Sequence, residues 1–154
     1  MKRRKLILLA VGIVPVITGW LCNALFMYAT GISSFLMMCS PWVWLAVCIA
    51  AADRRGKVFS QSLLLFAVGI VMIAVYICYR AFLIDAVSIF SPLNSLPQYY
   101  LGNWTFIAAR IYGLFDPKVI STGPIYYISA VLSCVFTFAG VFIKTRFKNV
   151  ERDF

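Results

Sequence analysis

The chain has 154 residues and a formal net charge of +9, and 63% of its residues are hydrophobic while 12% are charged. Soluble domains are about half apolar and about a quarter charged, so this composition excludes a single core surrounded by water. The length fits one domain, and we expect a single polytopic membrane domain over residues 1–154.

Four apolar segments each approach the length of about 20 residues that a bilayer span requires. Backbone groups in lipid must be hydrogen-bonded internally, so these segments are predicted to be helices. The predicted fold class is an all-α membrane protein with four transmembrane helices, over residues 6–29, 35–52, 58–79 and 124–143. Pro15 and Pro41 are expected to bend the first two helices.

The basic residues indicate the orientation of these spans. Runs of Lys and Arg precede the first span, separate the second from the third, and follow the fourth, whereas Arg80, Arg110 and Lys118 fall on the other side. Cytoplasmic loops carry the excess of Lys and Arg. We therefore expect both termini and the tail 144–154 to be cytoplasmic, in the cell (inner) membrane of a bacterium, with loop 80–123 outside.

The first span could also be read as a signal peptide, because Lys2 to Lys5 resemble its positively charged start. The apolar run continues without interruption to Ala29. We therefore expect the first span to be retained rather than cleaved.

The long outer loop contains a helical pattern. Apolar residues recur there at spacings of four, three, four and three, which places them on one helix face: Tyr100, Trp104, Ile107, Ile111 and Leu114. This spacing predicts an amphipathic interfacial helix from Tyr99 to Phe115 on the outer surface. It would serve as a lid over the bundle or as a docking surface for a membrane partner, with a re-entrant segment as a further alternative. Arg110 argues against a fifth span.

Small and hydroxyl-bearing residues line one face of the first and of the fourth predicted helix. On the first they are Gly12, Pro15, Gly19 and Asn23, and on the fourth they are Ser129, Ser133, Thr137 and Gly140. Such residues let helix backbones approach closely and bond across the interface. We expect these faces to pack within the bundle or against a second protein. An exposed Asn is costly in lipid, so Asn23 is expected to face protein.

Few residues in the sequence could support chemistry. The chain has no histidine, its five acidic residues lie outside the spans, and its five cysteines form no metal-binding motif. We therefore predict no catalytic residues, no metal and no cofactor. Arg80, at the outer end of the third span, is expected to extend its side chain to the membrane interface, near Asp85 as a charge partner, or else to pair with an acid on a partner helix. Asn103-Trp104-Thr105 matches the N-glycosylation pattern, but Trp104 is expected to be held in the interface, so we do not expect a glycan there.

These features favour a non-enzymatic accessory or interaction subunit that acts through helix contacts and its outer loop. Its expected partners are the lipid bilayer and another membrane protein or a second copy, but not nucleic acid, because the basic residues flank apolar spans. One alternative is a membrane immunity or exclusion protein, since the immunity proteins against pore-forming colicins are similar in size and in four-span layout. Another is a small oligomeric channel or transporter lined by Asn23, Ser129, Ser133 and Thr137.

Overall fold

The computed structural model describes residues 2–26, 28–83, 92–115 and 122–150, and over these ranges the fold is entirely helical. Four helical stretches are long and apolar enough to cross a membrane, which confirms the predicted number: Arg4–Phe26, Thr30–Ala51, Val58–Ala81 and Gly123–Arg146. Large apolar side chains such as Phe59 and Val131 cover the outside of the bundle. Together these features suggest a membrane-embedded protein.

The first of these stretches is broken rather than bent. It consists of α1 (Lys2–Val11) and α2 (Val14–Phe26), separated at Gly12 and Ile13. Pro15 explains the break, because it lacks an N–H and its ring clashes with the carbonyl four residues earlier. The second stretch, α3 (Thr30–Ala51), instead continues through Pro41 as one helix. As a result, α1 packs against α4 (Val58–Cys78), whereas α2 turns toward α3 and toward α5 (Pro92–Gly102).

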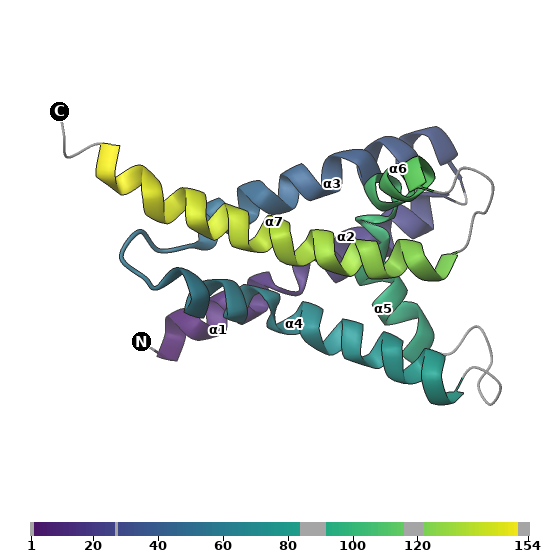
Figure 1. The fold of residues 1–154 in the computed structure, drawn as a ribbon, viewed down its shortest axis with the longest axis horizontal. Coiled ribbons are helices and arrows are strands. Elements are labelled where there is room, and N and C mark those ends of the chain that lie inside the picture. The colour runs from purple at the N-terminus through teal and green to yellow at the C-terminus, as the bar shows by residue number, and fades with distance from the viewer. Residues whose placement is uncertain (1, 27, 84–91, 116–121, 151–154) are drawn as a thin grey trace.

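Both ends of the chain lie at the same end of the bundle, together with the turn between α3 and α4 (Figure 1). We call this the basic end and the opposite one the far end. An ion pair between Arg4 and Asp53 joins α1 to that turn, and the Gln61 side chain bonds the Asp53 main chain through both its oxygen and its nitrogen. At the far end α4 continues into a π-helical turn, η1 (Tyr79–Leu83). The last helix, α7 (Thr122–Val150), extends beyond its predicted end, so most of the expected tail is helical.

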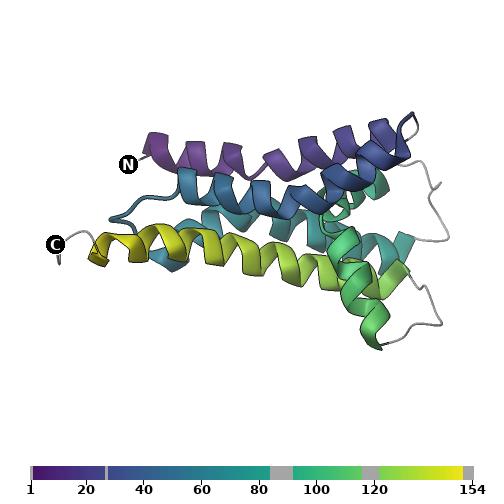
Figure 2. The same cartoon turned by 90° about the horizontal axis from the view of Figure 1, so that it is seen from above.

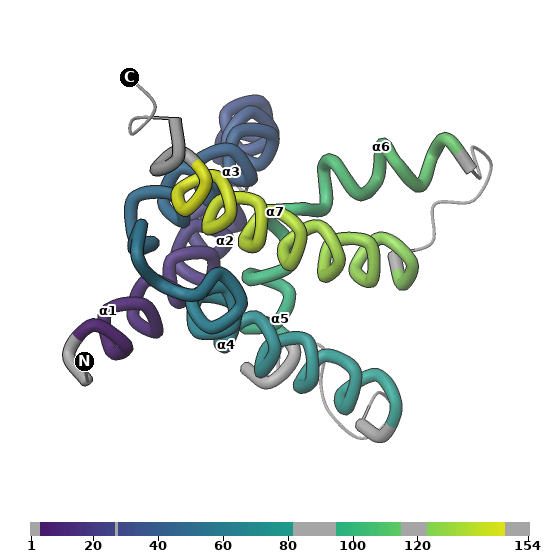
Figure 3. Tube along the Cα trace, turned by 60° about the vertical axis from the view of Figure 1, so that its left-hand side comes forward, coloured from purple at the N-terminus to yellow at the C-terminus, as the bar shows by residue number. Residues whose placement is uncertain are grey.

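The segment between η1 and α7 differs most from its prediction. It forms two short helices, α5 (Pro92–Gly102) and α6 (Thr105–Phe115), which we call the hairpin. α5 enters the bundle between α2 and α4, and α6 leaves it beside α7 and α3 (Figures 1 and 2). Figure 3 shows α6 beside the first half of α7. The two 11-residue helices are each about 16 Å long, roughly half of a hydrocarbon layer.

The single surface helix predicted over Tyr99 to Phe115 is therefore wrong. Tyr100 and Trp104 are only 1% exposed and belong to the core, whereas Leu114 is 83% exposed. Ile107 and Ile111 are half-buried. The prediction failed because apolar residues occur at the same helical spacing on a helix that faces the membrane surface and on a helix that faces neighbouring helices. The break at residues 103 and 104 then turns the second half of the pattern in another direction.

Two apolar clusters form the core. One lies toward the basic end and contains Leu8, Trp44, Cys48, Ala52, Leu65, Trp104 and Val141. The other lies in the far half, where α5 fills the space between the long helices, and contains Phe66, Tyr76, Tyr100 and Leu101. The hairpin thus contributes large side chains to both clusters.

Candidate functional site

The tip of the hairpin is held by the side chain of Asn103, which is 2% exposed. Its Nδ2 donates to the main-chain oxygen of Pro15 at 2.5 Å and lies 3.3 Å from two carbonyls of α5. Its Oδ1 accepts a hydrogen bond from the Thr18 hydroxyl at 3.1 Å, and the Ser40 hydroxyl donates to the Asn103 main-chain oxygen at 2.7 Å. One residue therefore connects α2, α3 and α5.

The tip lies about half-way along the bundle, as its contacts show. Ser40 is near the middle of the 22-residue helix α3, and Phe136 is near the middle of the 29-residue helix α7. The rings of Trp104 and Phe136 have centroids 5.6 Å apart. Irregular backbone at this depth is tolerated in membrane proteins only where it is buried in protein or lines a water-filled cavity, and the tip satisfies the first condition because Asn103 and Trp104 are buried.

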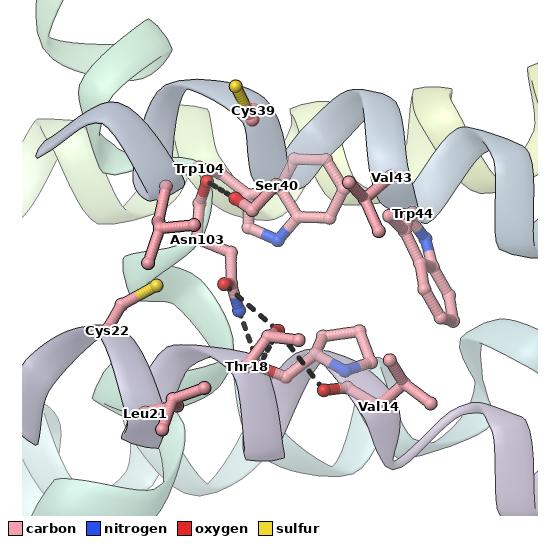
Figure 4. Close-up of a pocket in the computed structure, with 12 residues that line it drawn as sticks. Val14, Thr18, Leu21, Cys22, Cys39, Ser40, Val43, Trp44, Asn103 and Trp104 are labelled. Atoms are coloured by element: carbon pink, nitrogen blue, oxygen red, sulfur yellow. Dashed lines mark hydrogen bonds between the residues drawn. The ribbon is translucent and has the colours of Figure 1, made fainter. Parts of the chain in front are cut away.

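A cavity of about 180 Å³ lies between α2 and α3, with the hairpin tip beside it (Figure 4). Leu21 and Val43, on its rim, are 47% and 53% exposed, so the cavity opens sideways at the surface of the bundle. Its walls are almost entirely apolar, and none of the described residues that line it is charged: Val14, Pro15, Thr18, Leu21, Cys22, Leu36, Cys39, Ser40, Val43, Trp44, Asn103 and Trp104.

The polar groups around this cavity differ in whether they have partners. The indole nitrogen of Trp44 donates to the Thr137 hydroxyl at 3.0 Å, and the Asn103 amide is fully engaged. The indole nitrogen of Trp104 is buried and has no hydrogen-bond partner within the described residues. Figure 4 shows this nitrogen turned toward the space between α2 and α3. A buried donor without a partner costs about 1–3 kcal/mol.

A second cavity, of about 350 Å³, lies at the basic end between α1, the turn and the start of α4. Arg4, Lys5 and Lys57 line it together with Asp53, and Leu8 and Leu64 form its apolar part. Its surroundings are electropositive because three cations face one acid. The cavity therefore favours anionic groups, in contrast to the uncharged cavity between α2 and α3.

The structure separates the four small residues expected on one face of the first span. A Cβ atom on Gly12 would lie 2.8 Å from the Leu65 carbonyl oxygen of α4, whereas one on Gly19 would overlap the Tyr99 carbonyl of α5. Pro15 meets Asn103, as described above. Asn23 is exposed, on the rim of a surface groove at the far end. We expected Asn23 to face protein, and within this chain it does not, because α2 continues in a new direction after the helix break.

The four residues expected on one face of the last span share a buried face of α7. Ser129, Ser133 and Thr137 are fully buried, and each hydroxyl donates to a carbonyl within α7. A Cβ atom on Gly140 would lie 2.6 Å from Cys48 Cβ, so α7 and α3 approach closely there. These residues pack between helices of the same chain.

The charged residues singled out from the sequence lie at the far end. Arg110 is exposed, with its guanidinium carbon 5.6 Å from the centre of the Phe106 ring. Arg80 is exposed within η1 and lies near Gly123, where α7 begins. Asp85, its expected partner, lies outside the described residues. Within the described chain no cluster of three or more metal-binding side chains occurs.

Sequence reasoning missed the residues that build the α2–α3 cavity, above all Thr18, Cys22, Ser40 and Trp44. One signal was available at the hairpin tip. Gly102-Asn103 is a pair that commonly ends a helix, and it interrupts the helical pattern near its centre. The chain matches no known protein family, and neither a curated protein nor a solved structure matches it.

Proposed function

We propose that this is a non-enzymatic accessory protein of the bacterial cell membrane, which binds a lipid-soluble molecule in the cavity between α2 and α3. One observation carries this proposal: an uncharged, apolar cavity opens sideways half-way along four apolar helices. In a bilayer, hydrocarbon surrounds the bundle at that depth. A ligand would therefore enter from the lipid rather than from water.

The size of the cavity favours a small molecule over a partner helix. An engineered protein cavity of about 150 Å³ takes up benzene, and the cavity here measures about 180 Å³. A helix that docks in a groove instead inserts several side chains at helical spacing, which requires a row of pockets. One pocket that opens at the side of the bundle matches one ring-sized group.

The fourth helix does not favour a pore within one copy of the chain. A polar pathway needs hydroxyl groups that face water or ions. The hydroxyls of Ser129, Ser133 and Thr137 are fully buried and bond to α7 carbonyls, as side chains on packed helices commonly do. We therefore prefer the binding function to the channel alternative.

The proposed orientation places both termini and Gly56 in the cytoplasm, because the basic end carries most of the Lys and Arg residues. A reporter active only in the cytoplasm, fused at Gly56, should be active. Pro97 belongs to the hairpin, which enters the bundle from the other side. A reporter fused at Pro97 is therefore expected to be inactive. The opposite pattern would contradict the orientation.

Filling the cavity tests the function directly. Cys22 lines it, and Cys78 is exposed on α4, so Cys22→Phe and Cys78→Phe are a matched pair. After gentle extraction with lipid, solvent extracts of the unchanged chain and of Cys78→Phe should contain a lipid-soluble compound enriched over bulk membrane lipid. Cys22→Phe should lose that compound while still unfolding cooperatively, since overpacking costs about 1–3 kcal/mol. Equal extracts from all three proteins would contradict the proposal.

A further inference from the structure

We infer that the bound molecule carries a carbonyl oxygen on an uncharged, ring-sized group, and that the indole N–H of Trp104 donates a hydrogen bond to it. This inference rests on the proposed function and adds the chemical class of the ligand. It starts from a contrast between two tryptophans that line the same cavity. Trp44 has a hydroxyl partner, and Trp104 has none within the described residues.

Trp104 is held in place without using its N–H. The residue is 1% exposed, its ring packs against Phe136, and its main-chain nitrogen donates to the Leu101 carbonyl at 3.0 Å. The ring cannot turn toward water without leaving this packing. An acceptor must therefore come to the nitrogen, and the cavity is the open space that the nitrogen faces (Figure 4).

The other polar groups limit the ligand to one acceptor and no charge. The Asn103 amide is engaged with Pro15 and Thr18, and the Ser40 hydroxyl is engaged with the Asn103 main chain. No described residue in the cavity wall is charged, and an unpaired charge placed there would be strongly disfavoured. A neutral carbonyl oxygen accepts a hydrogen bond from the Trp104 N–H and needs no counter-ion or further partner.

Two simpler occupants fit less well. A water molecule needs two to four polar partners, and the cavity wall is almost entirely apolar. The ester carbonyls of phospholipids lie near the edge of the hydrocarbon layer, about 15 Å from its middle. The tip of the hairpin lies half-way along the bundle. The geometry therefore points to a molecule whose polar head can move into the hydrocarbon layer.

Nuclear magnetic resonance of the indole groups tests this inference. The chain has four tryptophans, so protein labelled with ¹⁵N in its indoles, in lipid nanodiscs, should give four N–H signals. Trp104→Phe identifies the signal of Trp104. The probes are hexylacetophenone and its isopropenyl analogue, which replaces the carbonyl oxygen by a methylene group of similar shape. The ketone should move the Trp104 N–H signal downfield, as a new hydrogen bond does, and the analogue should not.

Affinity gives a second measurement. Trp104→Phe removes the N–H donor together with the five-membered ring of the indole, and the analogue measures the packing change that both probes meet. The variant should weaken ketone binding about tenfold more than it weakens binding of the analogue, the usual effect of one hydrogen bond. Trp42→Phe, at an exposed residue of α3 outside the cavity wall, is the matched control and should bind both probes like the unchanged chain. Binding is measured against empty nanodiscs of the same lipid to subtract partition.

The outcomes separate this inference from the proposed function. If both probes bind equally and Trp104→Phe changes neither affinity, the cavity takes apolar groups and the carbonyl inference is wrong. If neither probe binds and Cys22→Phe extracts match those of the unchanged chain, the proposed function is wrong as well.

Discussion

The long helices pack differently in the two halves of this bundle. Toward the basic end, the long helices meet directly: Gly12 brings α1 against the Leu65 backbone, and Gly140 brings α7 against Cys48. In the far half, α5 separates α2 from α4, and Asn103 joins α5 to α2 and α3 by hydrogen bonds. Direct contact needs only small residues, whereas an inserted segment needs polar groups to satisfy its broken backbone.

The break in the first span creates this difference. α1 lies against α4, and after residues 12 and 13 the chain continues as α2 in a new direction. Space for the hairpin opens between α2 and α4, and the cavity remains between α2 and α3. The site therefore depends on Pro15, which ends one packing arrangement and begins the other.

The largest effect is expected where α5 touches α2. A Cβ atom on Gly19 would overlap the Tyr99 carbonyl, and backbone cannot move aside as a flexible side chain can. Gly19→Leu should lower the free energy of unfolding by more than about 3 kcal/mol, because overpacking here must displace α5. Gly31→Leu is the control, since a Cβ atom there has no neighbour within 4 Å. Denaturant titration in mixed micelles measures both, and equal losses would show that α5 does not touch α2.

The next effect concerns the polar tie in the far half. Asn103→Ala removes the amide that bonds Pro15 and Thr18 and leaves a buried carbonyl with fewer donors. We expect the free energy of unfolding to fall by about 2–4 kcal/mol, because several hydrogen bonds are lost. Asn23→Ala is the control, because Asn23 is an exposed asparagine on α2. It should change the free energy of unfolding by less than about 0.5 kcal/mol. If Asn103→Ala left the free energy of unfolding unchanged, the far half would not depend on these polar bonds, and the contrast between the two halves would be wrong.

A smaller effect is expected where the two halves meet. Trp44→Phe removes the hydrogen bond to the Thr137 hydroxyl between α3 and α7 together with part of the buried indole ring, and the bond alone should contribute about 1 kcal/mol. A double-mutant cycle with Thr137→Val isolates this bond. The coupling energy should be about 0.5–1.5 kcal/mol, and a coupling of zero would show that the indole and the hydroxyl do not meet.

The smallest effect lies at the basic end. The ion pair between Arg4 and Asp53 has side chains 54% and 33% exposed, so solvent screens it. Arg4→Gln should cost no more than about 1 kcal/mol, and the difference should shrink as salt is added. Unfolding at low and at high ionic strength measures it. A large loss that does not depend on salt would indicate a buried role for Arg4.

Much of the scaffold could be predicted from the sequence, because span length and hydropathy require no knowledge of tertiary contacts. The predicted span over residues 58–79 nearly matches α4, and the α7 stripe from Ser129 to Gly140 is buried in the structure. The hairpin could not be predicted in the same way. The spacing of Tyr100 and Trp104 reports a shared face but not what covers it, and 11-residue helices are too short to register as spans.

The cavity was beyond sequence reasoning for a related reason. Its wall combines residues from α2, α3 and the hairpin tip, and nothing in their spacing indicates that Cys22 and Trp104 share a surface. The Trp104 donor stands out only because, in the folded chain, the Asn103 amide and the Ser40 hydroxyl bond to other groups. These bonds join residues far apart in the sequence, so their spacing does not reveal them.

The central claim is that the hairpin enters the bundle, and thiol labelling along residues 95–114 tests it most directly. Single cysteines would replace each position in a chain whose five native cysteines are alanine, reconstituted in vesicles and treated with a membrane-impermeant maleimide. The structure predicts labelling that falls from both ends of the segment to a minimum at Asn103 and Trp104. Labelling that instead rises and falls every three to four residues, with no central minimum, would place one continuous helix on the surface and contradict the account.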